Sequence, residues 1–454
     1  MRRTLSTLAV MVLAACAPAA PQATRGAVMA ERADLPPPRR FTGTPDLPVP
    51  IQPNAQLARD FMALSFRLET GVRLDTFTRF EGPVTVAVEG RGPLPPTLDP
   101  DLDDLLERLR TEAGIEIDRA EPGKKASITV SVLPRATLAR HVPGAACFVV
   151  PRVSGWADYL ARRRSDAVDW TTLATRSRTS VFLPADVSPQ EIRDCLHEEL
   201  AQALGPLNDL YRLPHSVFND DNMHVALTEY DMTILRATYD PRLASGMSSA
   251  AVAARLPAIL AEINPRGRDG DGPAIAESDP GWTAALRGAL DPGGADATRL
   301  TDARRAVTMA ETAGWGDGRL AMSHLARGRA ALSLDGDEAV AAFLAAERAY
   351  ERAFGEGLQT AQITVQMVAF ALSSGQADVA LPALDRAIPA ARGGQNAALL
   401  ATLLLMRAEA IGMLGDVVEA RAVRREGLAW GRYAWGDAVL LRQTAEVASL
   451  RPAA

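Results

Sequence analysis

Polar side chains with the spacing of a ligand site are concentrated between residues 194 and 219. The stretch DCLHEELAQALGPLND (194–209) is followed, four residues later, by PHSVFN (214–219). Glu198 and Gln202 are four positions apart, so on a helix they project from one face, with Glu199 about 100° around the axis. This is the geometry of a metal site, but a carboxylate with amides forms a harder and weaker ligand set than the imidazoles that suit zinc.

The same stretch resembles the active-site helix of the metzincin zinc peptidases, whose pattern is HExxHxxGxxH. When the glycine of that pattern is aligned with Gly205, the three zinc-ligand positions are occupied by Glu198, Gln202 and Asn208. Glu199 takes the position of the general base. The resemblance implies a retained helix-and-turn frame in which every zinc-binding histidine has been replaced, and we expect no cofactor there.

The loop after the helix extends the resemblance. Asp209 stands where metzincins often carry an acidic residue, and residues 216–219 correspond to their Ser-x-Met turn, with Phe218 at the Met position. The implied fold brings the three ligand positions together beneath this turn, with a left-handed Gly205 reversing the chain. The amides should then hydrogen-bond each other, Glu198 or the turn. The candidate binding residues are Glu198, Gln202, Asn208, Asp209, Ser216, Phe218 and Asn219.

A second alignment of the motif begins at His197 and makes Glu198 the base. It places Ala201 and Leu204 at the second ligand and glycine positions, so it supplies one ligand and no turn. We favour the first alignment. A metal site that uses His197, His215 and His224 from outside the motif remains the alternative, with Glu199 as catalytic base and zinc or another divalent ion as cofactor.

The pairing of EELAQALG with SVFND is also similar to the DUF2927 family, bacterial lipoproteins of unknown function. The similarity covers approximately residues 50–245. It implies no activity.

The N-terminus has the pattern of a secretory signal: Met-Arg-Arg, the apolar residues 8–13, and then LAAC ending at Cys16. The last four residues resemble the lipobox of bacterial lipoproteins, in which Cys16 is lipidated. Ala17 after the cysteine favours the outer membrane in enteric bacteria, so we expect a periplasm-facing, lipid-anchored envelope protein. Residues 17–50 are rich in Ala, Pro and Arg and should form a flexible tether.

Two further cysteines, Cys147 and Cys195, remain if Cys16 is lipidated. In an oxidising compartment a disulfide between them would persist and would fix the start of the motif helix to the segment near Phe148. Two buried free thiols are the alternative.

Residues 51–245 alternate between helical and β patterns, which predicts an α+β domain with a mixed sheet. The expected helices cover residues 55–70, 98–113, 188–205 and 227–240, and the expected strands 83–88, 115–117, 126–132, 146–150 and 179–183. Residues 154–175 should be helical or irregular. A strand, a helix, further strands and then the motif helix is also the order of a metzincin upper subdomain.

Beyond residue 245 we expect a linker over residues 246–300, centred on a Gly/Pro-rich stretch, and an all-α repeat domain over residues 301–454. Gly336, Gly375 and Gly415 recur at intervals of 39 and 40 residues, each followed five positions later by alanine. This resembles tetratricopeptide helix pairs with a longer period, which present a concave surface for a partner protein.

The formal net charge of −6 provides no basic face for nucleic acid. Two hypotheses follow. The first is a non-catalytic binding or scaffold lipoprotein, in which a degenerate metzincin-like domain holds an envelope peptide and the repeats dock an envelope protein. The second is an active metallopeptidase that acts on an envelope peptide or protein.

Overall fold

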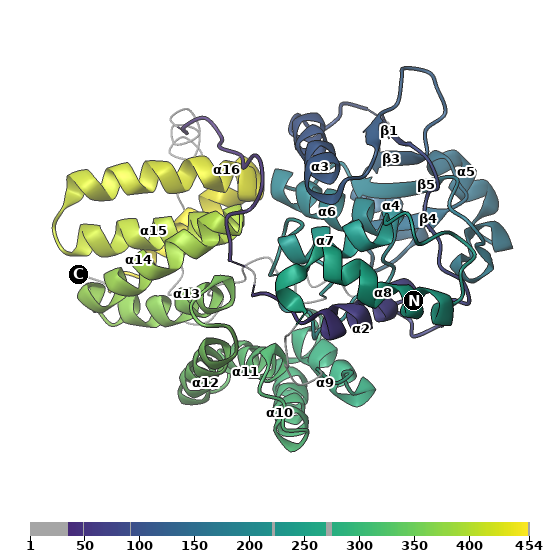
Figure 1. Cartoon of the computed structure of the whole chain (residues 1–454). Helices are drawn as coiled ribbons and strands as arrows, with labels where there is room; N and C mark the ends of the chain where they lie inside the picture. Colours follow the sequence, from purple (N-terminus) through teal and green to yellow (C-terminus); the bar gives the residue numbers. More distant parts are fainter. Residues whose placement is uncertain (1–34, 49, 91, 220–222, 269–274, 453–454) are drawn as a thin grey trace. The chain divides into compact units, whose positions relative to one another are not determined.

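The computed structural model describes residues 35–48, 50–90, 92–219, 223–268 and 275–452. The chain divides into two compact units (Figure 1). Of the described residues, the first unit contains 42–187 and 191–276, and the second contains 35–41, 188–190 and 277 onward. The first unit is a mixture of helices and one sheet, and the second is all-helical over its described residues.

The sheet of the first unit has five strands in the order β2-β1-β3-β5-β4. Neighbouring strands are parallel except at one edge, where β4 pairs with β5 antiparallel. The mixed sheet expected from the sequence is confirmed, with each strand within a few residues of its expected position. The strands are β1 (Val84–Gly90), β2 (Ile117–Arg119), β3 (Ile128–Leu133), β4 (Phe148–Pro151) and β5 (Thr179–Pro184).

Helices pack against both faces of this sheet because side chains along a strand alternate in direction. Val181 and Leu183 of β5 join the larger apolar cluster, whereas Phe182 joins a smaller one with Trp156 and Tyr159 of α5. Helices α2, α3, α6, α7 and α8 contribute to the larger cluster. In chain order the helices around the sheet are α2 (Asn54–Ser65), α3 (Leu98–Ala113), α4 (Arg135–His141), α5 (Gly155–Arg162), α6 (Pro189–Leu204), α7 (Glu229–Thr238) and α8 (Ser249–Ile263).

In the described part of residues 246–300, expected as a linker, lie the helices α8 and α9 (Pro280–Leu290) and the first turn of α10, which begins at Asp296. Helices α8 and α9 each have a side-chain cap, since Ser248 accepts from the amide of Ala251 and Asp279 from those of Gly281 and Trp282. The difference arises because the Gly/Pro-rich stretch is short and lies between these helices. The remaining short 3₁₀ segments are η1 (Asp166–Val168), η2 (Trp170–Thr172) and η3 (Pro265–Gly267).

The helices of the second unit pack in succession, each against the next. Gly375 and Gly415 take left-handed conformations between helices, with φ of 76° and 97°, whereas Gly336 begins a helix. The expected all-helical region is confirmed, but the three glycines do not share one structural role. After α9 the helices are α10 (Asp296–Thr312), α11 (Gly318–Ala331), α12 (Gly336–Phe354), α13 (Leu358–Ser373), α14 (Ala377–Gly393), α15 (Ala397–Met413) and α16 (Val417–Ala448).

The part of the chain expected as a tether is only partly described. Residues 36–41 lie along α16, and the Thr44 hydroxyl donates to Glu112 of α3. The signal segment and Cys16 lie outside the described residues. Among the described helices, none is both long and apolar enough to cross a membrane.

Candidate functional site

The motif helix α6 buries most of the side chains that the sequence singled out. Glu199 is fully buried, and His197 and Gln202 are almost as inaccessible, whereas Glu198 is partly exposed. The helix runs along the main apolar cluster, which its Leu196 and Leu200 join. Of the charged pair at positions 198 and 199, the residue at the general-base position therefore faces the interior.

The loop that leaves α6 makes different hydrogen bonds from those expected. The Gln202 amide donates to Asp209 Oδ1 at 3.5 Å, and the Asn208 amide donates to the carbonyl of Ala63 in α2 at 3.1 Å. The backbone follows the same course, since the Leu207 amide donates to the carbonyl of Leu64. The two amides were expected to pair with each other, with Glu198 or with the turn. Instead the loop packs against α2, where Asn208 finds its acceptor, and Asp209 is the loop residue that reaches Gln202.

Gly205 does not adopt the left-handed conformation expected of it. Its amide still donates to the Ala201 carbonyl, which continues the helical pattern. A Cβ at this position would lie 2.7 Å from Cγ2 of Thr238 in α7. Glycine is needed here because α7 approaches the end of α6 closely, and not because the backbone requires a positive φ.

Arg176 stabilises the C-terminal end of α6. Its guanidinium donates to the carbonyls of Gln202, Ala203 and Gly205 at 2.6, 2.7 and 2.5 Å. These carbonyls have no partner within the helix, and a cation near a helix C-terminus also opposes the helix dipole. Burial lowers the pKa of Arg176 to about 10, so it stays charged at neutral pH. The sequence gives no signal for this contact, because Arg176 lies 26 residues before the first carbonyl it caps.

The turn at residues 216–219 is held by Asp231 of α7. The Ser216 hydroxyl and the Val217 amide donate to its two carboxylate oxygens, and Thr228 donates through both its amide and its hydroxyl. Thr228 and Asp231 form the capping box of α7. Burial raises the pKa of Asp231 to about 6 despite these four donors. The Thr-x-x-Asp spacing was a sequence signal for this contact.

Phe218 and Asn219 connect the turn to the preceding loop. The Phe218 carbonyl accepts from the Leu210 amide at 2.9 Å, and the Asn219 amide donates to the Leu213 carbonyl at 2.8 Å. Phe218 itself is fully buried in the main apolar cluster. The polar side chains of the loop and turn are thus engaged in internal hydrogen bonds that fix one segment to another.

The comparison with known protein families matches most of the first unit. Residues 54–258 match the family model DUF2927, described as a protein of unknown function. These residues form a DUF2927 domain. The match begins at the first residue of α2 and ends within α8, so it contains the whole sheet, the motif helix and the turn. No curated protein and no solved structure matches the chain.

The loop after α6 in the DUF2927 domain also forms a buried ion pair that no sequence pattern indicates. Arg212 pairs with Asp60 of α2, and both side chains are almost fully buried. Tyr230 and Gln56 also donate to the Asp60 carboxylate, at 3.0 and 2.7 Å. A buried carboxylate requires such partners. The contact joins the loop to α2 and α7, and the separation of 152 residues hides it from any local pattern.

The three histidines proposed as alternative ligands in the DUF2927 domain are all largely buried. His197 accepts the Leu227 amide at Nδ1, and burial holds its pKa well below the ordinary value. The rings of His215 and His224 lie 6.3 Å apart, and His224 Nε2 lies 3.0 Å from the Pro214 carbonyl. Burial lowers the pKa of both to about 4. Within the described ranges, no three His, Cys, Asp or Glu side chains form a group that could hold a metal ion.

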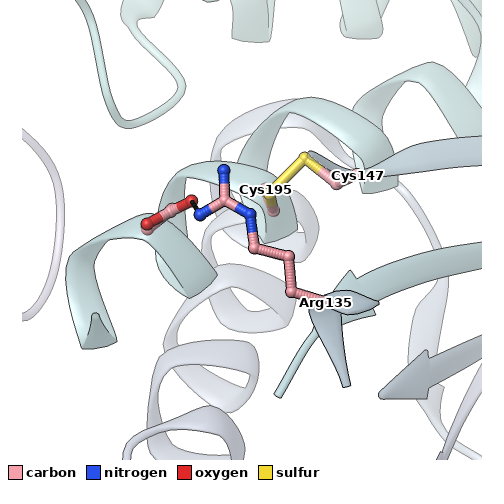
Figure 2. Close-up of a disulfide and its surroundings, with 4 residues drawn as sticks. Arg135, Cys147 and Cys195 are labelled. Atoms are coloured by element: carbon pink, nitrogen blue, oxygen red, sulfur yellow. Dashed lines mark ion pairs between the residues drawn. A yellow bond between two sulfur atoms is a disulfide. The ribbon is translucent and has the colours of Figure 1, made fainter. Parts of the chain in front are cut away.

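The disulfide expected in the DUF2927 domain is present between Cys147 and Cys195, with their Cα atoms 5.9 Å apart (Figure 2). It joins the residue before β4 to the middle of α6. Arg135 lies beside it and pairs with Glu191 of α6 at 3.5 Å (Figure 2). The prediction from the cysteine count is confirmed, and the motif helix is attached covalently to the antiparallel edge of the sheet.

Proposed function

We propose that this protein is an envelope lipoprotein with two binding parts and no catalytic activity. Its DUF2927 domain is a metzincin-like domain that holds an extended peptide or another envelope component, and its helical unit docks a partner protein. The observation that carries the proposal is the complete burial of Glu199. A general base must come within hydrogen-bond reach of its water or substrate, which a carboxylate fixed in the interior does not do.

The metzincin-like character is supported by the order of elements. A strand, a helix, further strands and then the motif helix follow one another from β1 to α6. The chemistry of the ligand positions supports the absence of catalysis, because one carboxylate and two amides do not reproduce the neutral imidazoles of a zinc centre. A helix and turn that are retained without zinc-binding histidines are suited to binding a peptide instead of cleaving it.

The residues that would contact a bound peptide are those of the frame that reach the surface. Glu198 and Asp209 are both partly exposed, at the middle of α6 and in the loop after it. Gln202, Asn208, Ser216, Phe218 and Asn219 lie behind them and fix the shape of the loop. In the second unit, helices stacked in succession form the kind of extended surface that helical arrays offer to partners.

Metal content and cleavage test the absence of catalysis. The purified full chain should bind no stoichiometric zinc after reconstitution, measured by plasma mass spectrometry, and should cleave envelope peptides no faster than its Glu199→Gln variant. Stoichiometric zinc together with cleavage that is lost in Glu199→Gln would overturn the proposal and establish the metallopeptidase alternative.

Restored histidines test the metzincin-like frame. The triple variant Glu198→His, Gln202→His, Asn208→His should bind zinc in competition with a chromogenic chelator while keeping the near-UV circular dichroism of the parent. The matched control replaces Asp209 in place of Asn208. The metzincin alignment requires it to bind more weakly, whereas the contact of Asp209 with Gln202 favours the control. Tighter binding by the control, or no binding by either folded variant, would reject the metzincin alignment.

A further inference from the structure

Residues 36–41, with the sequence PPPRRF, run along α16 of the helical unit. The Arg39 amide donates to the Ala429 carbonyl at 3.0 Å, and the Pro36 carbonyl accepts from Arg432 Nη1 at 2.8 Å. These two backbone groups are three residues apart, which is one turn of a polyproline II helix. The segment belongs to no helix or strand, and its backbone forms hydrogen bonds with groups of α16.

The side chains of this segment meet an aromatic and acidic surface. Phe41 is buried and stacks on Trp430, with ring centroids 4.2 Å apart and planes inclined by 24°. The guanidinium of Arg39 lies 5.9 Å from the same ring and 3.5 Å from Glu426. Arg392 of α14 also pairs with Glu426, at 2.9 Å.

The groups that recognise the segment occupy one short stretch of α16. Glu426, Ala429 and Trp430 are three and four residues apart, so they share one helical face, and Arg432 extends it. An aromatic ring that stacks on an aromatic side chain of an extended segment, with a carboxylate placed for arginine, is one way in which proteins bind short peptides. The proline residues also limit the conformational entropy that binding removes.

We propose that α16 carries a binding site for an extended, proline-rich peptide with an arginine two residues before an aromatic residue. Residues 36–41 occupy it as an internal ligand, and a partner protein with a segment of the same chemistry docks by displacing them. The inference rests on the proposed function of the helical unit and names the chemistry of its partner. The internal ligand is replaceable because the contacts that hold it are non-covalent, and its Arg39 side chain is exposed while the Glu426 side chain is partly exposed.

Competition by the internal segment has a measurable consequence. A ligand tethered to its own site acts at a high effective concentration, so it lowers the apparent affinity for an external peptide. Weakening the internal ligand in the full chain by Arg39→Ala with Phe41→Ala should therefore make external binding tighter, by roughly tenfold or more.

The experiment measures fluorescence anisotropy of a labelled LPPPRRF peptide with the intact chain and this double variant. We expect tight binding to the double variant, weaker binding to the parent, and a loss of roughly tenfold when the peptide ends in Ala instead of Phe. Adding Glu426→Gln to the double variant should also weaken binding. Arg425→Ala, on an exposed arginine of the same helix, is the matched control and should leave the affinity unchanged.

Equal affinity for the parent and the double variant, or affinity insensitive to the aromatic residue and to Glu426→Gln, would overturn the proposal. A dimeric parent that becomes monomeric in the double variant would also overturn it, because the segment would then occupy a second copy. If a captured partner protein still binds the Glu426→Gln chain as before, docking uses another part of the helical unit. In that case the α16 site is rejected while the proposed function stands.

Discussion

Gly205 controls how closely the motif helix approaches α7, and it is the residue at which the loop begins. Its backbone has no conformation reserved for glycine, so its side chain, or the lack of one, is what matters. The nearest atom to an added Cβ is the methyl carbon of Thr238, whose hydroxyl donates to the Ile234 carbonyl. The close approach of α6 to α7 thus depends on the absence of a Cβ atom at Gly205.

Gly205→Ala should destabilise the first unit by about 1–3 kcal/mol, the usual cost of an overpacked core, as measured by urea unfolding. Thr238→Ser removes the clashing methyl and keeps the hydroxyl, so the double variant should recover most of the loss. A double variant no more stable than Gly205→Ala would show that backbone conformation, and not steric contact, requires the glycine.

The pair His215 and His224 makes stability depend on pH. Both have a pKa of about 4 in the folded chain, against about 6.5 when unfolded. As pH falls through this window the unfolded state binds protons first, so the free energy of unfolding decreases; above about pH 6.5 the pair has no effect. The raised pKa of Asp231 has the opposite effect on stability between about pH 4 and 6. The measured dependence of the unfolding free energy on pH is therefore the sum of the histidine and Asp231 contributions.

His224→Gln isolates the contribution of one member of the pair. Glutamine keeps a donor for the Pro214 carbonyl and removes one titrating group. Relative to its value at pH 7, the stability of the variant should fall less on acidification, by roughly 3 kcal/mol at pH 4. Chemical unfolding at a series of pH values measures this, and parallel curves for variant and parent would contradict it.

At the scale of elements, α6 is held at both its middle and its end. Arg176 caps its last carbonyls, and the disulfide at Cys195 attaches it beside β4. The helix therefore does not depend on apolar packing alone for its position. Both attachments come from segments that precede it in the chain.

Arg176→Ala should lower the free energy of unfolding by about 3 kcal/mol, because it leaves buried carbonyls without donors. Arg178→Ala, two residues away and with a half-exposed side chain, is the matched control and should change stability by less than about 0.5 kcal/mol. Equal effects of the two substitutions in urea unfolding would show that α6 needs no cap from Arg176.

Removing the disulfide tests the second attachment. The bridge closes a separation of 48 residues, which in the chain-entropy model corresponds to about 4 kcal/mol. Cys147→Ser with Cys195→Ser should therefore lower the midpoint of unfolding under non-reducing conditions, and reductant should do the same to the parent but not to the variant. Free thiols detected by alkylation of folded parent protein would contradict the bond itself.

For the whole molecule, the proposed location depends on a residue that the structure does not describe. If Cys16 is lipidated, two or more acyl chains hold the protein stably on a membrane, which one chain does not. Cys16→Ser should then move the protein from the membrane fraction to the soluble fraction. Retention of the variant with the membranes, at the level of the parent, would reject the lipobox interpretation.

Local patterns in the sequence located the strands of the sheet and the helices α2, α3, α6 and α7, but not α4, α8 or α9. Helical periodicity with an acidic start and a glycine stop defined residues 98–113, where α3 lies, and β-branched alternation located the strands. The pairing of Cys147 with Cys195 followed from the number of cysteines and the expected compartment. These features are encoded within a few residues, because they depend on backbone conformation and on which face is apolar.

Only the tertiary structure decided which groups those elements bring together. The amide of Asn208 reaches α2, Arg176 caps α6, and Asp60 lies beneath the loop at Arg212. Residues 36–41 meet their contacts on α16 nearly at the other end of the chain. A buried polar group must find some partner, but its own neighbours in sequence do not specify which distant segment will supply it.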